Sequence, residues 1–437
     1  MKYSIYNKIV SIKENMSILY NSFSGTYILI NNDLAQCIKN GDIKKLLSEH
    51  VALLEELKEN GILIDDDVNE VEQVENLRLT RKFSNREYSL IINPTLNCNL
   101  NCWYCYEAHK ATDYMGKDLM EKILKHVKVQ HEISNYKFLS LSFFGGEPLL
   151  NKEIVVSIFS QTEKYCQNEG IQLNVGFTTN GTLMTKEFLT NFKDVKTRFQ
   201  ITLDGNKARH NAVRNYKGTD VGSYDKIIAN MKMMASIMTN YKLIVRINFD
   251  GKTLAGISDI LDDIDFLPRE RTVISTHRVW QVNESAVDYR QLFDFIYKAN
   301  ERGFVVNYIP LGGLLAYCCY ADNFSHAVIN FDGNVFKCTA RDFAPEHRDG
   351  YLNNEGQIIW SAPKVTERMS TRSPEICRKC TLYPSCLGIC SQNLLESNGS
   401  EKCRISSSID IDDAIRINFS QFLLIKKIQE KNGKKIV

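Results

Sequence analysis

The 437-residue chain lacks any apolar run that approaches the roughly 20 residues needed to cross a bilayer. Its start, MKYSIYNKIVSIKENMSILY, mixes charged with apolar residues and lacks the apolar core of a signal peptide. Net charge is also scarce, only +2 at pH 7, which gives no electrostatic reason to expect a nucleic-acid partner. No repeat or low-complexity segment stands out. These absences predict a cytoplasmic protein with neither a nucleic-acid nor a membrane partner.

Cysteine, in contrast, is plentiful: the chain has thirteen. Disulfides explain them poorly, because the cytoplasm keeps thiols reduced. Cys37 and Cys166 stand alone in predicted helices, which is typical of small core residues. The other eleven form three groups, 98/102/105, 318/319/338 and 377/380/386/390/403. Grouped cysteines in a reducing compartment indicate metal sites.

Residues 1–86 are predicted to form a small module of their own. Alternating apolar residues predict strands within residues 2–30, and helices follow over 31–41 and 42–61. A short strand at 62–67 and a helix at 68–77 complete a winged-helix-like arrangement. A purely structural cap is the alternative.

Residues 87–310 change to strands that alternate with helices. Six β-α units in a row predict an α/β fold with a parallel sheet, either doubly wound or curled into a partial barrel. In both folds the loops at the carboxyl ends of the strands form the active site. The first cysteine group lies in the loop after the first of these strands, where chemistry is therefore expected.

From residue 311 to 437 the sequence no longer predicts regular β-α units, and cysteines are more frequent than in the preceding residues. Residues 327–338 predict a β-hairpin that turns at Asp332–Gly333, and 377–390 predict a loop-rich knot. A helix is predicted close to the C-terminus, over 410–431.

The segment CNLNCWYCYE places Cys98, Cys102 and Cys105 in a C-x3-C-x2-C spacing. Three thiolates can hold three irons of a 4Fe–4S cube and leave the fourth iron open, whereas zinc is the alternative for the triplet alone. With Tyr104 before the last cysteine and six β-α units around it, the loop resembles that of the radical S-adenosylmethionine (SAM) enzymes. The resemblance implies a partial (β/α)6 TIM-like barrel in which SAM supplies the missing ligand and is cleaved to a hydrogen-abstracting 5′-deoxyadenosyl radical.

The same resemblance implies which residues bind SAM. The turn GGEP ends the second strand, where glycines leave backbone carbonyls accessible to an ammonium group and a carboxylate adds negative charge. Polar residues at the ends of the later strands would line the ribose and the carboxylate of the cofactor. The SAM-binding candidates are Gly145, Gly146, Glu147, Pro148, Thr179, Asn180, Asp204, Arg214 and Arg246. A surface or capping role is the alternative for the last three.

The C-terminal cysteines resemble the SPASM extension of radical peptide maturases, which holds two auxiliary 4Fe–4S clusters. The resemblance implies a distal cluster on Cys377, Cys380, Cys386 and Cys403, and a cluster nearer the barrel on Cys319, Cys338 and Cys390. Cys318 is the remaining candidate for the fourth ligand of the nearer cluster. Without the barrel, two paired-cysteine loops would suit a zinc ribbon. The resemblance therefore implies three 4Fe–4S clusters and SAM as the cofactors of this protein.

These features together resemble a radical SAM/SPASM peptide maturase. Ahead of such a barrel, residues 1–86 resemble a domain that binds the leader of a precursor peptide by strand addition. The layout is similar to the streptide synthase group, which joins lysine to tryptophan by a carbon–carbon bond. Thioether-forming sactipeptide or ranthipeptide maturases and a non-catalytic iron–sulfur electron carrier are the alternatives. A reducing partner such as flavodoxin or ferredoxin is implied, and no catalytic base is identified.

Overall fold

The computed structural model describes residues 1–49, 51–107, 109–110, 112–280, 287–308, 318–386, 388–396, 403 and 410–431. The chain divides into two compact units. Unit 1 comprises Met1–Phe83, Ile309–Asn323 and Glu367–Val437, and unit 2 comprises Ser84–Tyr308 and Phe324–Thr366. In the described parts of the chain, no helix is both long and apolar enough to cross a membrane.

Unit 2 is built on a parallel sheet whose strands follow one another in chain order. The strands are β6 (Glu87–Ile92), β7 (Phe138–Phe143), β8 (Gln172–Thr179), β9 (Thr197–Thr202), β10 (Tyr241–Phe249), β11 (Thr272–Arg278) and β12 (Val305–Asn307). Each strand from β6 to β11 pairs in parallel with the next, and β12 extends the edge. This confirms the predicted α/β partial barrel of six strands.

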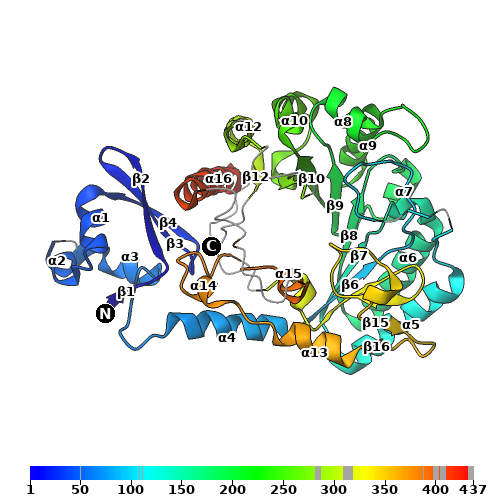
Figure 1. The fold of residues 1–437 in the computed structure, drawn as a ribbon, viewed down its shortest axis with the longest axis horizontal. Coiled ribbons are helices and arrows are strands. Elements are labelled where there is room, and N and C mark those ends of the chain that lie inside the picture. Colours follow the sequence, from blue (N-terminus) through cyan, green and yellow to red (C-terminus); the bar gives the residue numbers. More distant parts are fainter. Residues whose placement is uncertain are drawn as a thin grey trace. The chain divides into compact units, whose positions relative to one another are not determined.

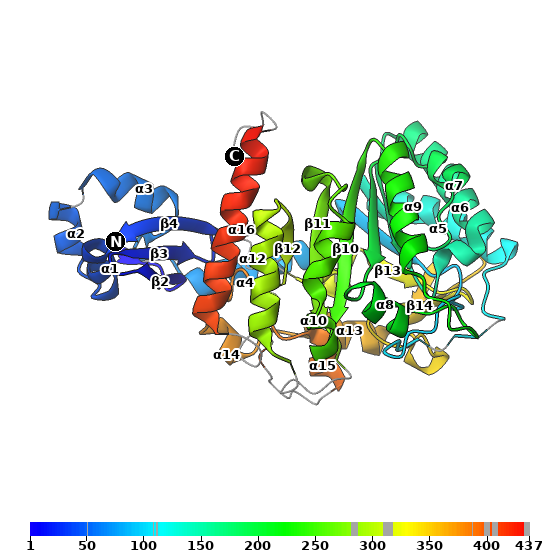
Figure 2. The ribbon, with the colours of Figure 1, turned by 90° about the horizontal axis from the view of Figure 1, so that it is seen from above.

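Helices connect these strands and lie along the outside of the sheet (Figures 1 and 2). They are α5 (Lys117–Ser134), α6 (Lys152–Glu169), α7 (Lys186–Thr190), α8 (Lys207–Val213), α9 (Tyr224–Ile237), α10 (Gly251–Leu254), α11 (Ile260–Asp263) and α12 (Tyr289–Glu301). The strands bury Leu, Ile, Val and Phe on alternate positions, so the apolar faces of the helices have a continuous surface to cover. The loops that leave the carboxyl ends of the strands are thereby fixed by a rigid sheet.

Residues 324–366 depart from the predicted domain boundary at 311. β13 (His326–Ile329) pairs in parallel with β6, and β14 (Asn334–Phe336), β15 (Gly350–Leu352) and β16 (Ile358–Trp360) continue the sheet as antiparallel strands. The predicted hairpin at Asp332–Gly333 is confirmed, with Gly333 at a φ of 84°. The pairing of β13 with β6 joins residues that are far apart in the sequence, which a local pattern does not reveal. α13 (Ala362–Ser370) follows, and the boundary between the two units falls within it, after Thr366.

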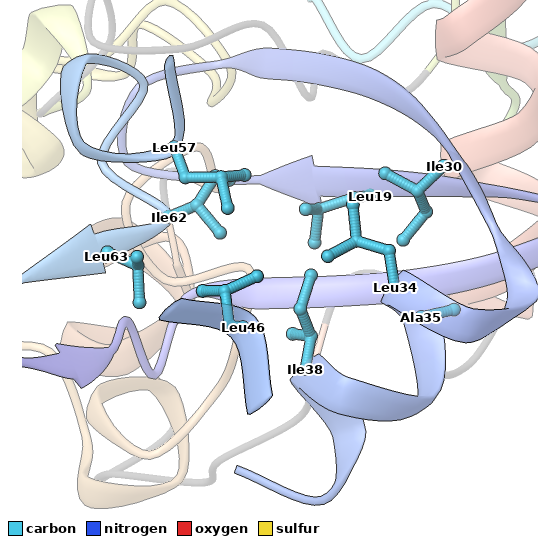
Figure 3. Packing of buried hydrophobic residues seen from close by; sticks show 9 residues of the cluster. All are labelled: Leu19, Ile30, Leu34, Ala35, Ile38, Leu46, Leu57, Ile62 and Leu63. Carbon is cyan, nitrogen blue, oxygen red and sulfur yellow. The ribbon is translucent and has the colours of Figure 1, made fainter. Parts of the chain in front are cut away.

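The N-terminal part of unit 1 contains two small sheets. β2 (Asn7–Lys13), β3 (Met16–Asn21) and β4 (Thr26–Asn31) form an antiparallel sheet, and β1 (Lys2–Tyr3) pairs with β5 (Leu63–Ile64). Its helices are α1 (Asn32–Lys39), α2 (Ile43–Glu49), α3 (Leu54–Glu59) and α4 (Glu70–Lys82). The helix predicted over 42–61 is therefore divided, with a 3-10 turn at Val51–Leu53. Figure 3 shows the buried core of this part, where Leu19 and Ile30 of the sheet face Leu34, Ile38 and Leu46 of the helices.

In the described residues, the C-terminal part of unit 1 contains α14 (Glu375–Arg378), α15 (Ser391–Glu396) and α16 (Ile411–Lys431). α16 lies against β2, where Arg416 donates to the carbonyl of Ser11 at 3.2 Å and Lys8 pairs with Asp412 at 3.1 Å. Residues 1–83 thus share one core with the C-terminal helix. They are not the independent domain that the sequence pattern predicts, because their apolar surface is completed by residues more than 300 positions away.

Candidate active site

The three-cysteine loop leaves the carboxyl end of β6. Cys98 is buried, and its Sγ accepts from the backbone N–H of Leu100 at 3.5 Å. The Sγ of Cys105 lies 3.2 Å from Nε2 of His109, whose Nδ1 is 2.7 Å from the carbonyl of Leu96. Burial raises the pKa of Cys98 to about 12 and that of Cys105 to about 11. Such thiols remain protonated at neutral pH unless a positive centre such as iron binds them.

The first two glycines of the predicted SAM-binding turn allow two backbones to run in contact. Gly145 has a φ of 105°, and a Cβ there would lie 2.3 Å from the carbonyl oxygen of Thr95. A Cβ on Gly146 would lie 2.3 Å from the carbonyl oxygen of Asn97. The backbone N–H groups of Gly146 and Glu147 donate to these same two carbonyls, at 3.2 and 2.8 Å. The turn after β7 therefore holds the chain that enters the cysteine loop.

Glu147 and Pro148 fasten this turn to the neighbouring strand. The carboxylate of Glu147 is fully buried and accepts from the hydroxyl of Thr179 at 2.8 Å, the backbone N–H of Asn180 at 2.7 Å and that of Leu149 at 3.0 Å. Pro148 opens the short 3-10 turn that Glu147 caps. Burial raises the pKa of Glu147, whereas these donors favour its charged form. Through these bonds the Glu147 side chain joins the ends of β7 and β8.

Asn180 connects this framework to the first cysteine. Its Nδ2 donates to the side-chain oxygen of Asn99 at 2.8 Å and lies 3.8 Å from the Sγ of Cys98. Its Oδ1 accepts from the backbone and hydroxyl of Thr182. Asn180 is thus beside the cysteine loop, and its predicted contact with SAM stays a prediction. An amide donor near a thiolate stabilises the negative charge that iron ligation requires.

The remaining SAM-binding candidates meet around Tyr104. Its hydroxyl donates to Asp204 and accepts from Arg214 at 2.6 Å, and Nδ2 of Asn248 lies 3.2 Å away. Asp204 and Arg214 are buried and form an ion pair at 3.5 Å. Arg246 joins through Asn248, to whose Oδ1 its Nε donates at 2.9 Å.

This network holds the cysteine loop on β9 and β10. Besides burial, the Arg214 charge is the main influence on the pKa of Cys102 and favours its thiolate. Asp204 also accepts from the backbone N–H of Asn248 at 2.8 Å, so that the ends of two strands are fixed together. The sequence identified Asp204, Arg214 and Arg246 but not Asn248 or His109. A histidine four residues after Cys105 was the only available signal for the latter.

The residues fit an iron–sulfur cluster better than a single metal ion. In the described residues, no three cysteine, histidine or carboxylate side chains are close enough to hold one ion. A cubane places each thiolate on a different iron and so requires thiols that are spaced apart. All thirteen cysteines lie in the described residues, and none of them forms a disulfide there. Cys98, Cys102 and Cys105 would hold a 4Fe–4S cluster, and the cluster with SAM would supply a 5′-deoxyadenosyl radical.

The predicted distal cysteines gather within unit 1. Cys380, Cys386 and Cys403 pack against one apolar core, and their charges, after burial, raise the pKa of Cys377. The Sγ of Cys380 accepts a hydrogen bond from the backbone N–H of Leu382 at 3.4 Å, and the Sγ of Cys386 accepts one from that of Gly388 at 3.3 Å. Such a set of four thiols fits the donors that a 4Fe–4S cluster requires.

The nearer auxiliary set draws its candidates from both units. Cys318, Cys319 and Cys390 belong to unit 1, and Cys338 belongs to unit 2. This cluster and its fourth ligand therefore stay a prediction from the sequence. The two lone cysteines are buried in α1 and α6, in agreement with the core role predicted for Cys37 and Cys166.

We expect Gly146→Ala to prevent cofactor cleavage, because its Cβ would overlap backbone carbonyls that cannot rotate away. Gly116→Ala is the matched control, since nothing lies within 4 Å of a Cβ at that helix cap. Iron content and 5′-deoxyadenosine formation would be measured for both variants. Normal cleavage by Gly146→Ala would contradict the close approach of the two backbones.

Residues 92–264 match the family model of the Radical SAM superfamily. The chain is 26% identical over 341 residues to the cysteine-type anaerobic sulfatase-maturating enzyme of Clostridium novyi (strain NT), covering 70% of this chain and 89% of that protein. It is 24% identical over 245 residues to the radical SAM cyclopropyl synthase TigE of Paramaledivibacter caminithermalis, covering 47% of this chain and 49% of that protein.

Two solved structures share the fold. The structure of anSMEcpe with bound AdoMet and the Cp18Cys peptide has a TM-score of 0.54 at 19% identity, covering 79% of this chain and 98% of that chain. The structure of Streptococcus suis SuiB bound to the precursor peptide SuiA has a TM-score of 0.51 at 17% identity, covering 93% of this chain and 100% of that one. The matched family and the geometry of the cysteine loop together identify this chain as a radical SAM enzyme.

Proposed function

We propose that this radical SAM enzyme matures a ribosomally made precursor peptide by hydrogen abstraction and forms a lysine–tryptophan carbon–carbon crosslink within it. The observation that carries the proposal is unit 1, where a strand-rich module shares a core with the distal cysteines. The peptide-bound SuiB structure covers 93% of this chain, whereas the anSMEcpe structure covers 79%. This difference favours maturation of a precursor peptide over sulfatase maturation. The bond type rests on the sequence resemblance alone.

The N-terminal sheet offers one free edge to a leader peptide. α16 covers the β2 edge through the bonds from Arg416 to Ser11. β4 is the other edge strand, and no further strand pairs with it in the described part of unit 1. Its Leu29 is 48% exposed, although its neighbours Ile28 and Ile30 pack on the module core. A leader strand could add to β4 and cover Leu29.

We expect Leu29→Lys to weaken leader binding by about tenfold, since burying a charge in place of an apolar side chain costs more than about 1.4 kcal/mol. Val51→Lys is the matched control, because Val51 is 61% exposed and belongs to the 3-10 turn Val51–Leu53 of the same module, not to β4. Fluorescence titration with a labelled leader gives the affinities. Deleting residues 1–86 would be a poorer test, because it would uncover the core shared with α16. Equal affinities for both variants would leave the module with a structural role only.

The reaction itself is tested with a peptide made from a short reading frame found beside this gene. Anaerobic incubation with SAM and a reducing partner such as flavodoxin or ferredoxin should give a peptide that has lost two hydrogens. Tandem mass spectrometry should place the link between a lysine and a tryptophan. A link between a cysteine sulfur and a carbon would identify a thioether maturase, which is the alternative within this class.

Sulfatase maturation is the second candidate, favoured by the similarity to the enzyme of Clostridium novyi over 89% of that protein. A sulfatase-derived peptide offered in parallel separates the two activities. Modification of that peptide, with the precursor left unchanged, would overturn the proposal.

A further inference from the structure

α4 places a buried arginine beside the distal cysteines. Arg78 has only 9% of its surface exposed, although it lies on a helix that the sequence marks as polar. Its Nη2 donates to the carbonyls of Tyr383 and Cys386, both at 2.8 Å, and its Nη1 donates to the hydroxyl of Ser373 at 2.8 Å. The guanidinium also lies 4.1 Å from the centre of the Tyr383 ring. Figure 1 shows α4 passing beside α14, which carries Cys377.

This cation has no anionic partner among the described residues. No carboxylate there lies within ion-pair distance of Arg78, and its Nε is buried without a hydrogen-bond acceptor. Glu75, one turn before it, acts on Arg78 only through longer-range charge. A buried charge without a partner is costly, so a compensating negative group is expected.

The distal cysteines supply that negative group. A Cβ on Gly388 would lie 3.8 Å from both Nη1 of Arg78 and the Sγ of Cys377, so the guanidinium and this thiol border the same small space. The charges of Cys386 and Cys377 act on Arg78. Four thiolates outweigh the positive charge of a 4Fe–4S core, so the occupied site is anionic.

We propose that Arg78 is the charge partner of the distal cluster, positioning the cysteine loop and raising the reduction potential of the cluster. A nearby cation favours the reduced cluster, which carries one more negative charge than the oxidised one. The inference rests on the distal cluster of the proposed function. It adds that α4, the last helix of the N-terminal module, sets the electron affinity of that cluster.

The full-length protein, reconstituted anaerobically, tests this with three variants. Arg78→Met removes the charge at similar length, whereas Arg78→Lys keeps the charge and loses the planar fork. Arg81→Gln is the matched control, because Arg81 is an exposed arginine of the same helix. Redox titration monitored by electron paramagnetic resonance gives the midpoint of the distal signal, identified as the one lost in Cys380→Ala.

Arg78→Met should shift the oxidised-to-reduced ratio at a fixed potential about tenfold toward oxidised, which is about 59 mV for one electron. Arg78→Lys should shift it less, and Arg81→Gln should leave it unchanged. A wild-type midpoint in Arg78→Met would overturn the proposal.

If Arg78→Met loses about four irons, the iron content of Arg78→Lys tests the charge role. A cluster that is retained in Arg78→Lys supports that role, and an equal loss of iron in Arg78→Lys overturns it. A wild-type protein without a signal that depends on Cys380 would refute the distal cluster itself, and this inference with it.

Discussion

Replacing Cys98, Cys102 and Cys105 together by alanine should abolish SAM cleavage and lower bound iron from about twelve to about eight atoms per chain. The reason is that these three thiols are the proposed ligands of the cluster, and a nearby imidazole, that of His109 at 3.2 Å from the Sγ of Cys105, could not hold a cluster alone. Asn180 is a hydrogen-bond donor to Cys98, and Arg214 is a cation beside Cys102, so neither can bind iron. We therefore expect 5′-deoxyadenosine at background level rather than a partial decrease.

Chemical iron and sulfide assays and chromatography of 5′-deoxyadenosine measure this result. Cys166→Ala is the control, because Cys166 is a buried cysteine of α6 in the same unit and belongs to no group. It should keep the full iron content and full cleavage. Zinc in place of iron, or cleavage that survives the triple replacement, would refute the assignment of this loop.

The barrel was predictable because its information is local. Each strand from β6 to β11 reads as an apolar segment that is followed by a helix, and parallel β-α units have one common handedness. The pairing of β13 with β6 was not predictable in the same way, since it depends on a contact over more than 230 residues. For the same reason the sequence divided unit 1 into two domains, although the β2–β4 sheet and α16 share a core.

The site shows the same division between local and assembled features. The spacing of Cys98, Cys102 and Cys105 and the glycines after β7 are visible in the sequence, because each depends on neighbours along the chain. The Asp204–Arg214 pair could be identified as polar residues after β9, but their bonds to Tyr104 exist only in the fold. Arg78 was missed completely, because an arginine on a polar helix normally faces solvent.

Cys380→Ala and Cys386→Ala should each form 5′-deoxyadenosine but yield at least about tenfold less crosslinked peptide. Joining two side chains removes two hydrogens. One is abstracted by the radical, and the other leaves as a proton and an electron, so an electron acceptor is required. The distal thiols are the residues that would hold it, and they belong to unit 1, whereas the SAM-binding candidates belong to unit 2. Loss of the acceptor therefore should not prevent the first abstraction.

The fold of unit 1 is the competing explanation for any loss of product. Cys380 and Cys386 pack against the core formed by Val10, Ile18 and Ile415, so their replacement could loosen the module as well as empty the cluster site. Cys37→Ala controls for this, because Cys37 is buried in the same unit and is bound to no proposed cluster. Leader affinity and 5′-deoxyadenosine would be measured beside the crosslinked peptide. Normal leader binding and normal nucleoside with little product would locate the defect in electron removal. Equal loss of all three would mean that these cysteines serve the fold, and unchanged product would mean that the electron leaves by another route.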